Sequence, residues 1–250
     1  MQHITEKEFY DAQWDTWVDM KIYGPASRWL RTLIFDLIKI INKKKYEVNT
    51  VIDVGCGEGT NTFYIAKYFA KANIKGIDFS ETAIKCAKLN YKLPNLEFIH
   101  DINSINLNLN YDLLCCFEVL EHVEDWKILL KRMANSSQKL LLLSFPTGRM
   151  RKFESNVGHI RNFQKGEVEN FLYKLNYKPI KIFYAGFPFY SPIYREFCNL
   201  TNAGNNSFTN GSKYGISQKL ISSIIYFMFK TLSTKNKMGD QFCGLFVKST

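Results

Sequence analysis

The sequence predicts an α/β fold, in which helices cover both faces of a seven-stranded, mostly parallel sheet and a cap is inserted before the last strand. Two observations predict it. Short apolar runs alternate along the chain with segments of helical spacing, which is typical of parallel strands joined by right-handed crossovers. In addition, the run VIDVGCGEGT at 51–60 leads from an apolar strand through three glycines into a helix.

The individual elements follow from the spacing of apolar residues. Pro25 suits the first turn of a helix, and apolar residues recur at helical spacing from Leu30 to Ile41. Apolar runs predict strands at 49–54, 74–79, 96–100, 111–117, 139–145, 178–184 and 241–247. The LLLL run of the fifth strand is typical of a strand covered on both faces. Helical spacing predicts further helices at 61–71, 81–90, 123–135, 166–175 and 220–232.

Composition argues against several classes of protein. No apolar run is long enough to cross a bilayer, and the first residues lack the pattern of a secretion signal, so we expect a cytoplasmic protein without stable membrane insertion. The six cysteines form no C-x-x-C pair and have no metal-ligand spacing with the four histidines, so we expect no disulfide framework and no metal. The net charge of +10 comes from dispersed lysines, which is more typical of a solvated surface than of a nucleic-acid interface.

The strongest motif is the glycine-rich turn after the first strand. Asp53 lies at the end of that strand, and Gly55, Gly57 and Gly59 follow at alternate positions. Glycines let the backbone approach a ligand closely, and the N–H groups of the next helix attract polar atoms. Because the spacing differs from G-x-G-x-x-G and no Walker lysine follows, the motif disfavours pyrophosphate binding.

Acidic residues also end the next two strands. Asp78 follows the second strand and can accept hydrogen bonds from both hydroxyls of a ribose, and Asp101 follows the third strand and can accept one from an adenine amine. Because the carboxyl ends of parallel strands share one edge of the sheet, these acids and Asp53 predict a nucleoside site there.

The segment CCFEVLEHVED after the fourth strand carries the family resemblance. Together with the motifs above, over about 51–145, it resembles the class I S-adenosylmethionine methyltransferases, in particular the branch whose fourth motif is E-V-L-E-H-V. The resemblance implies a Rossmann-like fold that binds S-adenosylmethionine, releases S-adenosylhomocysteine and uses no metal. It also implies roles for individual residues: Gly55 and Gly57 border the methionine part, Asp53 holds its amino group, Asp78 and Phe79 contact the ribose, Asp101 and Ile102 contact the adenine, and Glu118 lies near the sulfonium.

Two flanking segments suggest how a substrate is held. YGPASRWLR resembles the leading helix of bacterial methyltransferases that modify surface glycans, which implies that Arg28 pairs with the cofactor carboxylate and that Tyr23 contacts substrate; a solvent-facing arginine is the alternative. GHIRNFQKGEVENFL resembles a family segment that follows the fifth strand. There His159 could remove a proton from a hydroxyl, and Arg161 could hold a substrate anion or brace the loop. His122 is the competing base, or else fixes its own turn.

These segments divide one methyltransferase domain, 1–250, into four parts: an N-terminal arm and helix (1–46), a cofactor-binding core (47–186), an inserted cap (187–238) and the last strand (239–250). The apolar helix at 220–232 suggests burial, a homodimer seam or contact with a membrane surface.

The resemblance leaves several functions open. The first is an O-methyltransferase for a small polar molecule that contains sugar or phosphate, such as a capsule or surface-polysaccharide precursor or its phosphoryl modification. The alternatives are a methyltransferase for a quinone or other lipid-like molecule and a binding module without catalysis. Methylation of nucleic-acid bases is disfavoured, because no D-P-P-Y or N-P-P-Y motif follows the fourth strand.

Overall fold

The computed structural model describes residues 19–101, 105–201, 213–236 and 238–249. The N-terminal arm up to residue 18, the predicted adenine contact Ile102, and residues 202–212 of the cap lie outside the described residues.

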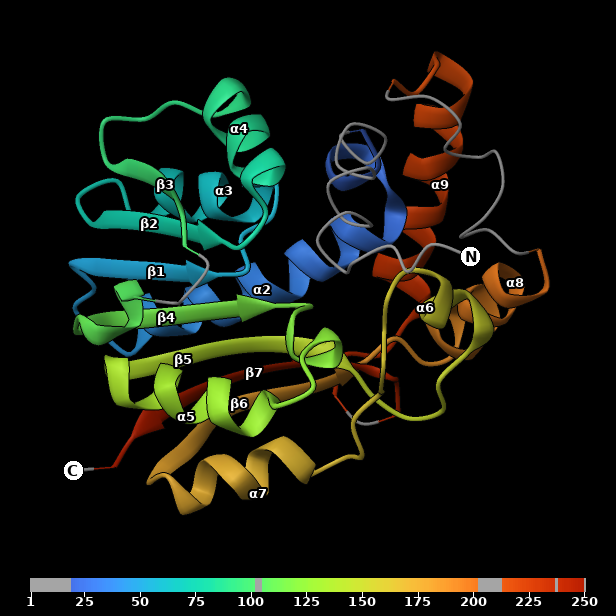
Figure 1. Cartoon of the computed structure of the whole chain (residues 1–250). Coiled ribbons are helices and arrows are strands. Elements are labelled where there is room, and N and C mark those ends of the chain that lie inside the picture. Colours follow the sequence, from blue (N-terminus) through green and yellow to red (C-terminus); the bar gives the residue numbers. More distant parts are fainter. Residues whose placement is uncertain (1–18, 102–104, 202–212, 237, 250) are drawn as a thin grey trace, which may run out of the picture.

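A single seven-stranded sheet forms the centre of the fold, with the strand order β3-β2-β1-β4-β5-β7-β6 (Figure 1). Its strands are β1 (Thr50–Val54), β2 (Asn73–Asp78), β3 (Leu96–His100), β4 (Tyr111–Phe117), β5 (Ser137–Pro146), β6 (Tyr177–Ala185) and β7 (Gln241–Lys248). β1 to β5 pair in parallel, and β7 is antiparallel to both β5 and β6. The predicted seven-stranded, mostly parallel sheet is confirmed.

Helices cover both faces of this sheet (Figure 1). These are α2 (Pro25–Lys43), α3 (Thr60–Tyr68), α4 (Glu81–Asn90), α5 (Trp126–Ser136) and α7 (Glu167–Lys174). The other helices, α6 (Lys152–Asn156), α8 (Arg195–Leu200) and α9 (Ile216–Leu232), lie beyond the carboxyl ends of the parallel strands (Figure 1). Val51 packs with α2 and α3 on one face, and its neighbour Ile52 packs with α5 and α7 on the other. Successive side chains of a strand point to opposite faces, so the strands covered on both faces are mostly apolar, as in Leu140–Leu143 of β5.

The segment between β6 and β7 forms a π-helical turn at Phe189–Tyr194, followed by α8 and α9. α9 lies along α2, where the hydroxyls of Thr32 and Tyr226 are 2.9 Å apart and Phe229 is fully buried (Figure 1). The sequence suggested that this helix is buried, and for most of α9 that suggestion is wrong. Six large apolar side chains of α9 are exposed to solvent: Ile216, Leu220, Ile221, Ile224, Phe227 and Leu232.

Among the described residues, no helix combines the length and the hydropathy that a bilayer span requires.

Candidate cofactor-binding site

The glycine turn after β1 is fixed to the end of β2 by backbone hydrogen bonds. The N–H groups of Gly55 and Cys56 both donate to the carbonyl of Ile77, and the N–H of Gly57 donates to Asp78 Oδ2 at 2.8 Å. Gly55 has a φ of +72°, and a Cβ at this position would lie 2.3 Å from Val119 Cγ2. Glycine is therefore required here both by the left-handed backbone and by the close approach of Val119.

A cavity of about 100 Å³ opens beside this turn, at the carboxyl ends of β1 and β4. Four of the residues predicted to contact the cofactor line it: Asp53, Gly55, Gly57 and Glu118. The other lining residues are Lys21, Ser27, Leu30, Arg31, Cys56, Glu58, Thr60, Asn61 and Phe117. The cavity lies where ligands bind in open α/β sheets, beyond the carboxyl ends of the strands.

Asp53 is buried and only partly satisfied. Its Oδ2 accepts a hydrogen bond of 2.6 Å from the Thr62 hydroxyl, while Oδ1 has no partner among the described residues. Burial, together with the nearby carboxylates of Asp78 and Glu58, raises the pKa of Asp53 to about 7 despite the opposing effect of the Thr62 hydrogen bond. Oδ1 is therefore available to accept a hydrogen bond from a ligand.

Asp78 and Asp101 lie side by side at the ends of β2 and β3. The N–H of Asp101 donates to the carbonyl of Asp78, and both side chains are buried. Asp78 accepts from the N–H of Ser80 with Oδ1 and from that of Gly57 with Oδ2. Burial raises the pKa of Asp78. The next residue, Phe79, is 40% exposed.

Glu118 is held in place by two side chains that the sequence analysis did not identify. Its Oε1 accepts hydrogen bonds from the Ser144 hydroxyl at 2.8 Å and from Gln241 Nε2 at 2.9 Å. Desolvation raises the pKa of Glu118, although these two hydrogen bonds act to lower it. Gln241 begins β7, so this contact links the cavity to the last strand, and nothing in the local sequence indicates such a long-range contact.

The structure places Arg31, and not Arg28, at the cavity. Arg28 donates to the Ser223 hydroxyl at 3.0 Å, and its guanidinium lies 4.1 Å from the centre of the Tyr226 ring, so it contacts α9. Arg31, one helical turn later, lines the cavity and donates to the carbonyl of Lys21 at 2.7 Å. The helical period explains the difference, since residues three apart differ in direction by about 60° and only one of the two faces β1.

Both arginines also line a second, open cavity of about 320 Å³ between α2, α3 and α9, together with Lys39. Tyr23 is half-buried, and Lys219 Nζ lies 4.3 Å from the centre of its ring. Neither cavity is lined by Tyr23.

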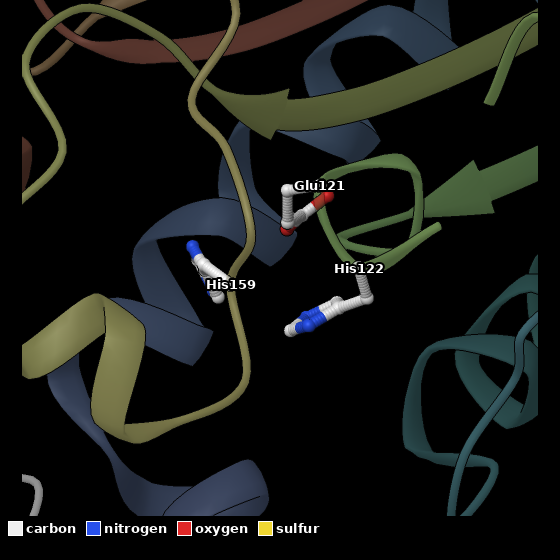
Figure 2. Close-up of side chains that lie close together, drawn as sticks. All are labelled: Glu121, His122 and His159. Atoms are coloured by element: carbon white, nitrogen blue, oxygen red, sulfur yellow. The ribbon is translucent and has the colours of Figure 1, made fainter. Parts of the chain in front are cut away.

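The structure brings the two candidate bases together. The rings of His122 and His159 lie 4.7 Å apart between their centres at an angle of 88°, beside Glu121 (Figure 2). Burial lowers the pKa of His122, and it lowers that of His159 to about 3. Both rings are therefore neutral near pH 7. Arg161 follows in the same loop, and its buried Nε has no hydrogen-bond partner among the described residues.

Comparison with known proteins agrees with this geometry. The methyltransferase domain family matches residues 46–182, more than half of the chain. Among solved structures, the magnesium protoporphyrin IX methyltransferase of Synechocystis PCC 6803 with bound SAH has a TM-score of 0.61 at 15% identity and covers 96% of both chains. The plantazolicin methyltransferase BpumL with SAH has a TM-score of 0.54 at 18% identity, covering 98% of both chains.

Curated relatives match over shorter stretches. A ubiquinone biosynthesis O-methyltransferase of Hydrogenovibrio crunogenus is 32% identical over 120 residues, which is 44% of this chain and 46% of the relative. The malonyl-[acyl-carrier protein] O-methyltransferase of Bacillus anthracis is 29% identical over 94 residues, 36% of this chain and 35% of the relative. The chain thus spans less than half the length of these relatives. The match over 46–182, together with the glycine turn and the acids at the strand ends, establishes that this chain belongs to the class I S-adenosylmethionine-dependent methyltransferases.

Proposed function

We propose that this protein transfers the methyl group of S-adenosylmethionine to a hydroxyl oxygen of a small molecule. The observation that carries the proposal is the cavity beside the glycine turn, where the buried Oδ1 of Asp53 has no hydrogen-bond partner among the described residues. An unsatisfied buried carboxylate oxygen is costly unless a ligand donates to it.

The residues around the cavity fit the parts of this cofactor. The amino group fits the free oxygen of Asp53, and the carboxylate fits the guanidinium of Arg31, which can bind it with two hydrogen bonds. At the next strand ends, Asp78 with Phe79 would contact the ribose, and Asp101 with Ile102 the adenine. Without side chains, Gly55 and Gly57 let the methionine chain approach the backbone of the turn closely.

The protein's own contribution is alignment and handling of the acceptor's proton. When bound, S-adenosylmethionine supplies an electrophilic methyl group, whose bond to sulfur breaks with the electron pair left on sulfur as the bond to the acceptor oxygen forms. The acceptor hydroxyl loses its proton, and the neutral rings of His159 or His122 are the bases that sequence analysis predicts. Arg161 in the same loop can contact an anionic part of the acceptor.

Two acceptor classes are supported by different surfaces. Arg28, Arg31 and Lys39 around the open 320 Å³ cavity favour an acceptor with phosphate or sugar groups, such as a surface-polysaccharide precursor. The exposed apolar side chains of α9 favour a quinone or other lipid-like acceptor, which the similarity to a ubiquinone biosynthesis O-methyltransferase also supports.

The test is calorimetric titration with S-adenosylmethionine and S-adenosylhomocysteine, followed by a methyl-transfer screen over nucleotide sugars, phosphorylated sugars and quinone analogues with a hydroxyl group. Saturable binding of both compounds and turnover on one acceptor class support the proposal. Absence of binding to both would overturn it, and binding without turnover on any hydroxyl acceptor would favour a module that only binds the cofactor.

We infer three further properties, each open to measurement. Residues 187–238 act as a cap over the acceptor, and the protein works in the cytoplasm, where its six free cysteines stay reduced. Where the acceptor is polar and does not occupy the exposed face of α9, that face joins two copies in a homodimer. Sedimentation at several concentrations tests the dimer. Phe227→Glu on the exposed face should shift the equilibrium to monomer, and Phe227→Leu should not.

A further inference from the structure

A second group of side chains capable of chemistry lies next to the cavity but does not line it. It comprises Glu121 and His122 of the turn after β4 and His159 of the loop after α6. One donor atom from each of the three side chains lies within 4.8 Å of the other two (Figure 2). Two imidazoles and a carboxylate that converge in this way form a ligand set typical of divalent transition metals.

Glu121 is the most unusual member of this group. It is fully buried, and neither of its carboxylate oxygens has a hydrogen-bond partner among the described residues. The carboxylate of Glu118, which lines the cofactor cavity, is near enough to repel it. A buried carboxylate with no hydrogen-bond partner and a second carboxylate nearby is costly unless a positive charge compensates it. A bound cation would provide that charge.

His122 is oriented in the way that metal-ligating histidines are. Its Nδ1 lies 2.9 Å from the carbonyl oxygen of Gly158. A carbonyl oxygen can only accept, so Nδ1 carries the proton, and Nε2 is the nitrogen that bears the lone pair in the neutral ring. A backbone carbonyl that fixes the tautomer through the other ring nitrogen is the usual support of a metal ligand.

The loop that carries His159 is held firmly against the turn that carries Glu121. The N–H of Ile160 donates to the carbonyl of Glu121 at 3.1 Å, and the N–H of His159 donates to the carbonyl of Glu154 at 3.0 Å. Glu154 is in turn paired with the buried Arg195 of α8. Ligand atoms around a zinc ion with bonds of about 2.1 Å lie roughly 3–4 Å apart, so side-chain rotations alone can close this group around an ion.

We propose that Glu121, His122 and His159 bind one divalent transition-metal ion, such as Zn²⁺ or Co²⁺, with coordination positions left open beside the cofactor cavity. The catalytic role of this ion rests on the proposed function. An open coordination position can hold the oxygen of the acceptor hydroxyl and favour loss of its proton to water. The histidines are then ligands and not proton acceptors. The spacing of the sequence concealed this group, because the loop at 158–160 brings His159 to the turn at 120–122 only in the folded chain.

Direct binding of Co²⁺ and Zn²⁺ to the full chain, stripped beforehand with dipicolinate, tests the site. We expect one ion per chain, a visible absorption band for Co²⁺, and binding at least about 100-fold weaker in Glu121→Gln, His122→Ala and His159→Ala. The matched control is His100→Ala, because His100, at the end of β3, lies with its Nε2 2.9 Å from the carbonyl oxygen of Phe79 and is not one of the three proposed ligands. Its affinity for Co²⁺ should equal that of the native protein. Circular dichroism and the affinity for S-adenosylhomocysteine show whether each variant is folded.

X-ray absorption of the native zinc protein needs no variant. Two imidazole nitrogens with an oxygen neighbour, at about 2.0–2.1 Å, support the assignment. Absence of saturable binding, equal binding by the three variants, or an all-oxygen shell would overturn it. Failure of this inference is distinct from failure of the proposed function: a protein that binds S-adenosylhomocysteine and methylates a hydroxyl in the presence of chelator disproves the metal role alone.

Discussion

At the scale of single residues, two neighbouring buried carboxyl groups differ in their hydrogen bonds. Asp53 has one partner and a free oxygen, and its pKa is raised to about 7. Asp78 accepts from two backbone N–H groups, which oppose the same effect of burial. The first is a carboxyl group that a cationic ligand would ionise, and the second also holds the glycine turn in place.

We expect Asp53 to make the free protein less stable as the pH rises from about 4 to about 7. The unfolded carboxyl, with a pKa near 3.9, loses its proton in this range while the folded one keeps it, so ionisation favours the unfolded state by up to about 4 kcal/mol. Above pH 7 the loss is complete. Urea unfolding of the native protein and of Asp53→Asn at several pH values measures this loss of stability.

Burial also raises the pKa of the nearby Asp78, so the difference between the two proteins is the relevant quantity. Parallel pH curves for the native protein and the variant would contradict the expected role of Asp53.

Replacing Asp78 should weaken cofactor binding. We expect Asp78→Ala to lower the affinity for S-adenosylmethionine by about 10-fold or more, because the ribose loses its acceptor and the N–H of Gly57 loses its partner. Calorimetry measures the affinity. Glu97→Gln, at an exposed ion pair on β3, is the control and should bind normally. Unchanged affinity of the Ala variant would remove Asp78 from the site.

At the scale of elements, the strands were predictable and the short helices were not. The seven strands match the predicted ranges to within a few residues, because strands buried on both faces are continuous apolar runs. The helix expected at 123–135 begins three residues later, as α5 (Trp126–Ser136), and the 3-10 turn before it at Leu120–His122, α6 and α8 were not predicted. Helices this short bury too few residues to leave a period in the sequence.

The same distinction holds for the candidate site. The glycines and acids at the strand ends follow from topology, so four of them could be placed at one cavity from the sequence. The choice between Arg28 and Arg31 depends on the rotation of α2 against the sheet. The contacts of Glu118 with Gln241 and of His122 with His159 join segments that only the fold brings together.

Gly55 links the glycine turn to the turn after β4. Gly55→Ala should destabilise the protein by roughly 1–3 kcal/mol and abolish S-adenosylhomocysteine binding, because an L residue is strained at a φ of +72° and its Cβ would displace Val119. Thermal unfolding and calorimetry measure both effects. Gly215→Ala is the matched control: at the start of α9, with a φ of −65°, its Cβ would meet only Gln218 at 3.6 Å. Equal behaviour of the two variants would refute the argument.

At the scale of the whole molecule, the sheet is completed from the end of the sequence. β7 lies between β5 and β6, and six of its eight residues are buried. Gln241, its first residue, also contacts Glu118 at the cavity. The last strand therefore contributes both to the core and to the site.

We expect a chain that ends after Asp240 to lose its cooperative fold, because β5 and β6 would then have no strand between them and the core would lose its apolar contacts with β7. A chain that ends after Lys248 keeps all of β7 and should unfold like the native protein. Far-ultraviolet circular dichroism during heating distinguishes them. A cooperative transition in the shorter chain would show that the sheet is stable without β7.

The position of β7 also sets an order of events during synthesis. A ribosome makes β1 to β6 before β7, so the emerging chain carries an apolar β5 whose outer edge has no partner until the last segment is released. Such an edge can pair with other chains. Slow translation of the segment between β6 and β7 should therefore change the yield of native protein, and a chaperone that covers strand edges should matter most in the interval before β7 arrives.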